Sequence, residues 1–178
     1  LIMQSPVAKA ILSGEDHIVE IANDALLKNI WRKNSADVIG RKVLDVFPEL
    51  KKQQYAKLLQ EVYATGVKHT GKESFMWING DDGLVHYYVD FEYAPVFSSD
   101  NIVSGIKITA VDVTEKVKAR KQIEESEKRF RSLAESLPQL VWETDEKGNA
   151  LFASGRWQEY SGITPGGEAE WKAIIHPD

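Results

Sequence analysis

The hydrophobic period of the chain changes at Gly66. Before it, in 51–65, apolar side chains repeat at helical spacing on one face, namely at Tyr55, Leu58, Leu59, Val62 and Tyr63. After it, aromatic and β-branched residues alternate with polar ones, which predicts strands over 73–78, 84–97 and 102–111. Gly66 itself suits the end of the helix.

The first quarter of the chain adds two more strands and several short helices. Residues 8–12 and 18–22 are apolar runs separated by a turn, which is typical of a β-hairpin. A helical segment capped by Asn23 or Asp24 follows, and then a short helix over 35–39. Two strands, short helices and three further strands predict an α+β fold. We expect one antiparallel five-stranded sheet with helices on one face.

A long charged helix is predicted from Asp112 to Leu137, a stretch without Gly or Pro. Asp112 and Glu115 have the spacing of a capping box at its start. Small or apolar residues recur four and three apart, as in a short coiled coil, at Ala119, Ile123, Ser126, Phe130, Leu133 and Leu137. We expect Ile123, Phe130 and Leu133 to lie between helices, most simply in a parallel homodimer. The alternative is a spacer with solvated charges.

Composition excludes several classes of function. The net charge of −5 argues against a nucleic-acid surface. No apolar run approaches the roughly 20 residues that cross a bilayer, and the first residues lack a signal-peptide pattern, so we expect a cytoplasmic protein with no membrane span. The chain has no cysteine, which excludes disulfides, thiolate nucleophiles and cysteine zinc sites.

After the long helix the pattern of the first strands begins again. Strands are predicted over 140–144 and 150–154, followed by a helical turn over 156–160, which suggests tandem modules. The repeat stops early, so we interpret the chain as a piece of a longer protein. Because two strands with unpaired edges are marginal alone, we expect 140–178 to be poorly ordered or to pack against another chain.

Three stretches in the first half are distinctive: Asn23-Asp24-Ala25-Leu26 after the first hairpin, Val38-Ile39-Gly40-Arg41-Lys42-Val43, and the closing Val111-Asp112-Val113-Thr114-Glu115. Together they resemble PAS domains, the sensory modules of bacterial signalling proteins. In the second half, a PAS subtype common in histidine kinases is similar to Trp142-Glu143-Thr144-Asp145, Tyr160-Ser161-Gly162 and Ile175-His176-Pro177-Asp178.

The resemblance implies a tandem PAS sensor region of a sensory-box protein. It divides the chain into a complete PAS domain at 5–113, a signalling helix at 114–137 and the first part of a second PAS domain at 138–178. The implied role is to sense a small molecule or a partner and to signal through a dimeric linker helix to an output domain in the same chain. That output would be a histidine kinase of a two-component phosphorelay, performing protein-histidine phosphotransfer.

Other interpretations remain open at this point. The PAS pair could be a ligand-free dimerisation scaffold in front of a diguanylate cyclase or a transcription regulator. From a different class, the chain could be a small stand-alone α+β enzyme. No catalytic constellation supports an enzyme: His86, Asp90 and Glu92 alternate on what reads as an outer strand face, and Gly162–Gly167 lacks the Lys of a phosphate-binding loop. We therefore expect this fragment to catalyse nothing.

The resemblance also implies two sites. A pocket between sheet and helices for a small apolar or aromatic ligand would be lined by Ile21, Leu26, Phe75, Trp77, Tyr87, Val89, Phe91, Ile106 and Ile108, although these side chains could equally fill the core. Asp112, Thr114 and Glu115 would transmit the signal from the sheet to the long helix, although Asp112 could be a simple cap.

No cofactor or metal is predicted. The flavin adduct of light-sensing PAS domains needs a cysteine, which the chain lacks. Haem-binding relatives typically carry an axial histidine on the long helix of the domain, so the resemblance does not imply haem here. The helix over 51–65 contains no His, and His17, His69 and His86 fall in turns or strands. The four His are not arranged with the spacing of metal ligands.

Overall fold

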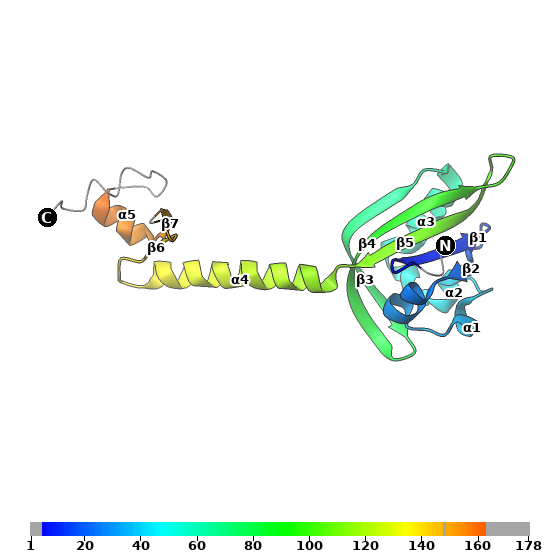
Figure 1. Ribbon diagram of the computed structural model, residues 1–178, viewed down its shortest axis with the longest axis horizontal. Coiled ribbons are helices and arrows are strands. Elements are labelled where there is room, and N and C mark those ends of the chain that lie inside the picture. The colour runs from blue at the N-terminus through cyan, green and yellow to red at the C-terminus, as the bar shows by residue number, and fades with distance from the viewer. Residues whose placement is uncertain (1–4, 148, 163–178) are drawn as a thin grey trace. The chain divides into compact units, whose positions relative to one another are not determined.

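The computed structural model describes residues 5–147 and 149–162 and divides the chain into two compact units, Leu1–Lys118 and Ala119–Asp178. The first unit contains a five-stranded antiparallel sheet in the order β2-β1-β5-β4-β3 (Figure 1). Its strands are β1 (Ala8–Ser13), β2 (Ile18–Ala22), β3 (His69–Gly80), β4 (Gly83–Phe97) and β5 (Val103–Asp112). The predicted five-stranded antiparallel sheet is therefore confirmed.

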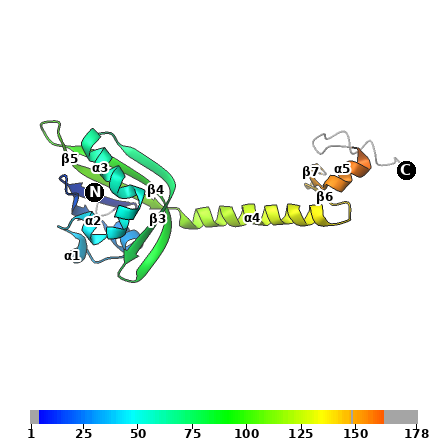
Figure 2. The same cartoon turned by 180° about the vertical axis from the view of Figure 1, so that it is seen from behind.

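The helices between β2 and β3 gather on one face of this sheet (Figure 2). They are the π-helical η1 (Ala25–Trp31), α1 (Ser35–Val38), α2 (Val43–Val46), the 3-10 helix η2 (Pro48–Lys52) and α3 (Gln54–Thr65). The helix expected over 51–65 is thus divided, with its first two residues in η2. Gly66 ends α3 as expected, with a positive φ of 67° and its N–H donated to the Val62 carbonyl.

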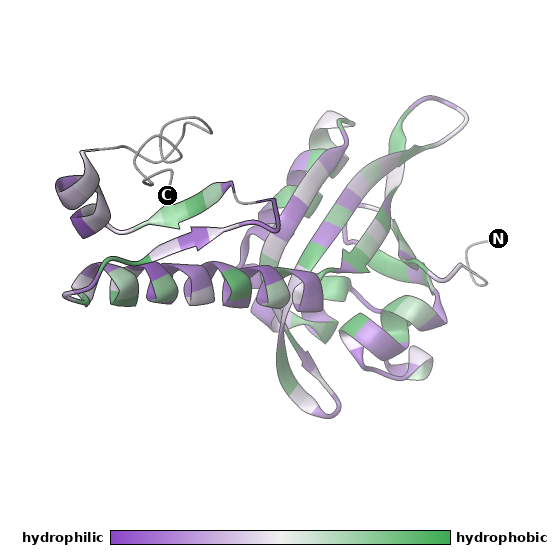
Figure 3. Ribbon diagram, turned by 60° about the vertical axis from the view of Figure 1, so that its left-hand side comes forward, coloured by the Kyte–Doolittle hydropathy of each residue, from purple (hydrophilic) through white to green (hydrophobic). Residues whose placement is uncertain are grey.

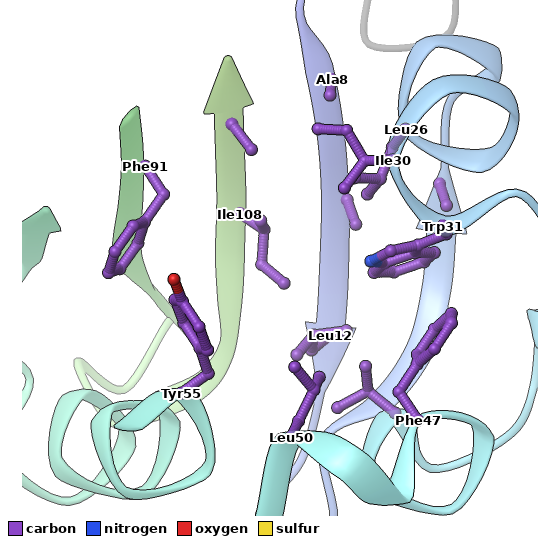
Figure 4. Packing of buried hydrophobic residues seen from close by; sticks show 14 of the residues in the cluster. Ala8, Leu12, Leu26, Ile30, Trp31, Phe47, Leu50, Tyr55, Phe91 and Ile108 are labelled. Carbon is purple, nitrogen blue, oxygen red and sulfur yellow. The ribbon is translucent and has the colours of Figure 1, made fainter. Parts of the chain in front are cut away.

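Alternation along the strands places the core between the sheet and these helices. Side chains from β1, β4, β5, η1 and α3 point toward one another there (Figure 4). The inner residues expected on β4 and β5 are buried, including Tyr87, Val89, Phe91, Ile106 and Ile108. Tyr55, Leu59 and Val62 are buried on α3, so its predicted apolar face is confirmed.

Asn23 joins the first strands to η1. Its side chain is fully buried, and its Oδ1 accepts the N–H groups of Lys9 at 2.9 Å and Leu26 at 3.1 Å. Its Nδ2 donates to the carbonyls of Ser5 and Val7. Asn23 is therefore the helix cap that the sequence predicted as one of two options, whereas Asp24 pairs on the surface with Lys28.

A bulge interrupts the pairing of β3 with β4 between Gly71 and Ser74. Glu73 has a positive φ of 46°, and its N–H donates to Asp90 Oδ1 at 2.7 Å. Gly71 is required here, because a Cβ would lie 2.2 Å from the ring of Phe91. The bulge changes the phase of β3 and thereby decides which of its residues face the core.

The second unit contains most of α4 (Thr114–Ser136), which begins in the first unit, together with β6 (Trp142–Thr144), β7 (Ala150–Ala153) and α5 (Gly155–Ser161). Strands β6 and β7 pair antiparallel, as the repeat predicted. The Glu135 carboxylate accepts the N–H of Gly155 at 2.9 Å, at the start of α5. The predictions for 163–178, including the Gly-rich stretch and Ile175-His176-Pro177-Asp178, lie outside the described residues.

The surface of α4 is mainly hydrophilic with isolated hydrophobic positions (Figure 3). Thr114, Val117 and Ala134 are nevertheless buried. Within 5–147 and 149–162, no helix combines the length and the apolar character needed to span a membrane.

Gly105 gives a direct test of how closely β1 and β5 pack. A Cβ at this position would lie 2.4 Å from the backbone carbonyl oxygen of Leu12, which cannot move without shifting β1. We expect Gly105→Ala to lower the free energy of unfolding by about 1–3 kcal/mol, as measured by urea denaturation. Lys107→Ala, at an exposed position of the same strand, should change it by less than about 0.5 kcal/mol. Equal stability of both variants would contradict this packing.

Candidate functional site

The junction between β5 and α4 is held by hydrogen bonds to β4. The N–H of Val113 donates to the Tyr88 carbonyl at 2.8 Å, continuing the antiparallel ladder by one residue. The Val113 carbonyl accepts the N–H of Val117 in the first turn of α4. Thr114 Oγ1 accepts the N–H of Tyr88 at 2.9 Å. The Thr114 hydroxyl therefore accepts the N–H that the Val113 carbonyl would accept in a regular ladder, while the Val113 carbonyl accepts a helical N–H instead.

Asp112 and Thr114 both contribute to this junction. Asp112 ends β5, and its Oδ1 accepts the N–H of Thr114 at 2.9 Å, which satisfies a free donor of the first turn. Thr114 and Val117 are buried, so the first turn is anchored on the sheet. The helix begins at Thr114 rather than at Asp112, and the expected capping role of Glu115 is wrong. Glu115 is exposed and pairs with Lys118.

Tyr87, next to Tyr88 on β4, points to the opposite face and reaches η1. Its hydroxyl donates to the Asn29 carbonyl at 3.0 Å and accepts Arg32 Nη1 at 2.7 Å. These two adjacent residues of β4 therefore contact η1 through the Tyr87 hydroxyl and the start of α4, at the end of β5, through the Tyr88 backbone N–H.

Arg32 fastens the end of η1 to the turn between β3 and β4. Its Nε donates to Asp82 Oδ1 at 2.6 Å, and its Nη2 donates to the carbonyls of Ile78 and Gly83. Burial disfavours the charged guanidinium, but the hydrogen bonds with Asp82 and Tyr87 outweigh burial and raise the pKa of Arg32. The cation is therefore held in a fixed position, and η1 and the hairpin are coupled.

The core encloses a cavity of about 30 Å³ between the sheet and the helices. Its lining is mostly apolar: Leu26, Ile30, Trp31, Val43, Leu50, Tyr55, Leu59, Met76, Ile78, Val89, Phe91, Tyr93, Ile108 and Ala110. This volume suits one or two water-sized molecules, whereas pockets for larger organic ligands occupy about 300–1,000 Å³. A larger ligand would require core side chains to move.

The structure sorts the predicted pocket residues into three groups. Leu26, Val89, Phe91 and Ile108 line the cavity. Tyr87 and Ile106 are buried in the core without lining it. Ile21, Phe75 and Trp77 were assigned to the wrong face of the sheet: Phe75 is 46% exposed and contacts the rings of Trp77, His86 and Tyr88.

The cause of the error on β3 is a run of four apolar residues. From Phe75 to Ile78 no polar residue marks the outer face, so the phase cannot be read, and the bulge shifts it. Met76 and Ile78 are the inward pair. On β2 the buried residues are Val19 and Ala22, which lie three apart because the pairing with β1 shifts register between Ile11 and Leu12, and Ile21 pairs with Ile11 and is only half-buried.

The sequence pattern did not identify two tyrosines of the cavity wall, one on α3 and one on β4. Tyr55 and Tyr93 are the wall residues with hydroxyl groups, and Tyr93 follows Phe91 in the inward phase of β4, a signal that could have found it. Burial raises the pKa of Tyr55 to about 12, and burial followed by the proximity of Tyr55 raises the pKa of Tyr93 further. Both hydroxyls stay neutral at physiological pH, so the wall favours an uncharged occupant.

The polar stripe on the outer face of β4 has structural contacts. Asp90 accepts the N–H of the bulge residue Glu73, Glu92 lies 3.6 Å from Lys68, and His86 packs on Phe75. In the part of the chain that the structure describes, no three His, Asp or Glu side chains are grouped so that they could hold a metal ion.

Comparison with known proteins agrees with this geometry. A family model described as the PAS fold matches residues 3–118. The chain is 28% identical over 162 residues to "Uncharacterized protein y4lL" of Sinorhizobium fredii (strain NBRC 101917 / NGR234), covering 88% of this chain and 19% of that protein. It is 32% identical over 81 residues to "Hybrid signal transduction histidine kinase H" of Dictyostelium discoideum, covering 45% of this chain and 6% of that protein. The chain thus spans only a small part of these curated relatives.

Among solved structures, the PAS domain of BvgS from Bordetella pertussis is similar, with a TM-score of 0.54 and 17% identity. The match covers 72% of this chain and 92% of that one, and it shows the fold alone. The sheet order, the helices on one face and the family match over 3–118 together lead to one conclusion: the chain belongs to the PAS family of sensor domains, which are typical of signal transduction.

Proposed function

We propose that this chain is a cytoplasmic sensor region that transmits a change in its PAS core through α4 to an output domain in a longer protein. The observation that carries the proposal is the pair of adjacent contacts on β4. Tyr87 binds Asn29 and Arg32 at the end of η1, and Tyr88 donates to Thr114 at the start of α4. A shift of the helical wall of the core would therefore move the strand that anchors the outgoing helix.

A small neutral molecule in the core is the input that the cavity favours. The wall supplies apolar surface and the hydroxyls of Tyr55 and Tyr93, with no charged side chain among its residues. The volume of about 30 Å³ limits the occupant to a few heavy atoms unless the core expands.

The proposed output is a histidine kinase, with the signal passing to it through a dimer of α4. The similarity to a hybrid signal transduction histidine kinase supports this output. Ile123, Phe130 and Leu133 are 61%, 47% and 58% exposed in the single chain, so their apolar surface is accessible to a second helix. Phe130 also contacts the ring of Phe152.

The proposal includes a second PAS module that begins at residue 138. The β6-β7 hairpin followed by α5 has the order of β1, β2 and η1, which supports a repeat of the same architecture. We propose that α4 connects two modules of one kind and that this fragment itself catalyses nothing, while the longer protein transfers phosphoryl groups to histidine.

A second candidate is a ligand-free PAS scaffold that dimerises in front of a diguanylate cyclase or a transcription regulator. The tight core favours it, since packed side chains leave a cavity of only about 30 Å³. The two candidates differ in whether the core takes up a ligand and in which domain follows.

Thr114 offers a test of the junction. Thr114→Val keeps the shape but removes the hydroxyl that accepts the Tyr88 N–H, a loss of about 1–3 kcal/mol in local stability. In the full-length protein we expect Thr114→Val and Asp112→Ala to change the autophosphorylation response to the signal more than they change ligand affinity. Thr114→Ser retains the hydroxyl and should respond like the wild type. An unchanged response in both altered proteins, with the fold intact, would contradict coupling.

The α4 contact can be tested by sedimentation. We expect the wild-type chain to dimerise, and Ile123→Glu combined with Leu133→Glu to weaken the dimer at least about tenfold, because four like charges would face each other. Lys128→Glu changes charge at another exposed position of α4 and should leave the dimer in place. A wild-type chain that stays monomeric at high concentration would refute the proposed contact.

Native mass spectrometry tests the core ligand. We expect a small neutral adduct on the wild-type chain that is lost in Ala110→Val, because Ala110 lines the cavity and two added methyl groups would fill it. Ala94→Val, on the outer side of β4, should keep the adduct. Absence of any adduct from wild-type protein purified under native conditions would favour the scaffold.

A further inference from the structure

His17, in the turn between β1 and β2, is buried without hydrogen-bond partners for its ring. Its side chain is 3% exposed, and neither Nδ1 nor Nε2 reaches a partner in the described part of the chain. A neutral imidazole has one N–H to donate and one nitrogen to accept with. Leaving a buried polar atom unpaired costs about 1–3 kcal/mol, so the fold holds this ring in place at a cost.

The backbone of the turn does not explain the choice of His. His17 has a positive φ of 52°, its N–H donates to the Gly14 carbonyl, and its carbonyl accepts the N–H of Val43. Asn or Gly would fit that conformation at least as well. The ring must therefore be explained by its own surroundings.

Those surroundings are apolar on one side and acidic on the other. The ring lies edge-on to Tyr63 of α3, with centroids 5.7 Å apart. A groove of about 670 Å³ is formed by the turn and α3 and is lined by Glu15, Asp16, Gln60, Tyr63 and His17, among others. The segment after α1 contributes Lys42, which lies 2.7 Å from Asp16.

These neighbours favour different positions for the two protonation states. Burial lowers the pKa of His17, and the Gly14 carbonyl, Asp16 and Glu15 oppose it to a smaller extent. Inside the turn, the Gly14 carbonyl favours the protonated ring, but burial outweighs it. In the groove, an imidazolium could donate to water and would lie beside two carboxylates, Glu15 and the Lys42-paired Asp16.

We propose that the β1-β2 turn is a proton-operated latch, in which the neutral His17 ring stays packed against Tyr63 and protonation releases it into the acidic groove. The latch acts outside the core cavity and thus adds a pH input that the proposed ligand sensing does not include. It contacts α3, which supplies Tyr55 and Leu59 to the cavity wall, so opening would be transmitted to the core.

The direction of the pH effect follows from the lowered pKa. Above pH 6.5, the usual pKa of His, the ring is neutral in both folded and unfolded chains and stability does not depend on it. As pH falls below 6.5, the unfolded or opened chain binds the proton first, so the closed turn loses stability until the pKa of the closed state is reached.

An NMR titration of the whole chain from pH 8 to pH 5 tests the latch. We expect the His17 ring to titrate with a midpoint below 6.5, and the Tyr63 ring and the Gly14 and Val43 amides to shift with the same midpoint. Amide exchange at Ile108 in β5 should stay slow, which separates local opening from global acid unfolding. His86→Gln, at an exposed His of β4, should keep this transition, and His17→Asn should abolish it.

A His17 midpoint at or above 6.5 would overturn the proposal. So would Tyr63 and turn signals that do not follow the ring, loss of protection at Ile108 with the same midpoint, or a transition that persists in His17→Asn. If His17→Asn fails to fold, the titrations of the wild type and of His86→Gln still decide, because both use the native turn.

Discussion

The buried carboxamide of Asn23 is the contact on which the architecture of the sensor depends. It satisfies backbone groups of the N-terminal segment, β1 and the first turn of η1 at once, at a position where water cannot replace it. The start of η1 is thereby fixed, and with it Leu26, Ile30 and Trp31 on the cavity wall. The end of η1 is fixed separately by Arg32. A helix held at both ends can move only together with the groups that hold it.

Strand β4 converts this restraint into a connection with α4. Tyr87 and Tyr88 are adjacent in sequence, and Tyr87 contacts η1 through its hydroxyl while Tyr88 contacts the start of α4 through its backbone N–H. In the proposed coupling, the two contacts are therefore separated by one peptide unit. The core cavity is lined by residues of η1, and the groove at the β1-β2 turn is lined by residues of α3. Because both helices belong to the layer that packs on the sheet, the two proposed inputs could converge on β4.

Much of the fold could be predicted because local periods report local structure. The alternation in β4 and β5 and the apolar face of α3 were strong enough to fix their orientation. The phase of β3 was not readable, because Phe75 to Ile78 are all apolar and a bulge precedes them. Thr114 was identified by resemblance, but its role as a ladder acceptor requires knowing that Tyr88 lies opposite. Arg32 and Asp82 are fifty residues apart, and no pattern in one sequence links them.

The bulge in β3 has a consequence for how copies of the protein can associate. Strand β3 is an edge of the sheet, where unpaired N–H and carbonyl groups could recruit another strand. Glu73 has a positive φ, and its N–H donates to the Asp90 carboxylate, so the regular row of donors and acceptors along that edge is broken. The opposite edge, β2, has only five residues. Both borders of the sheet are thus poor templates for β-addition, so the fold disfavours polymerisation of the protein through its sheet.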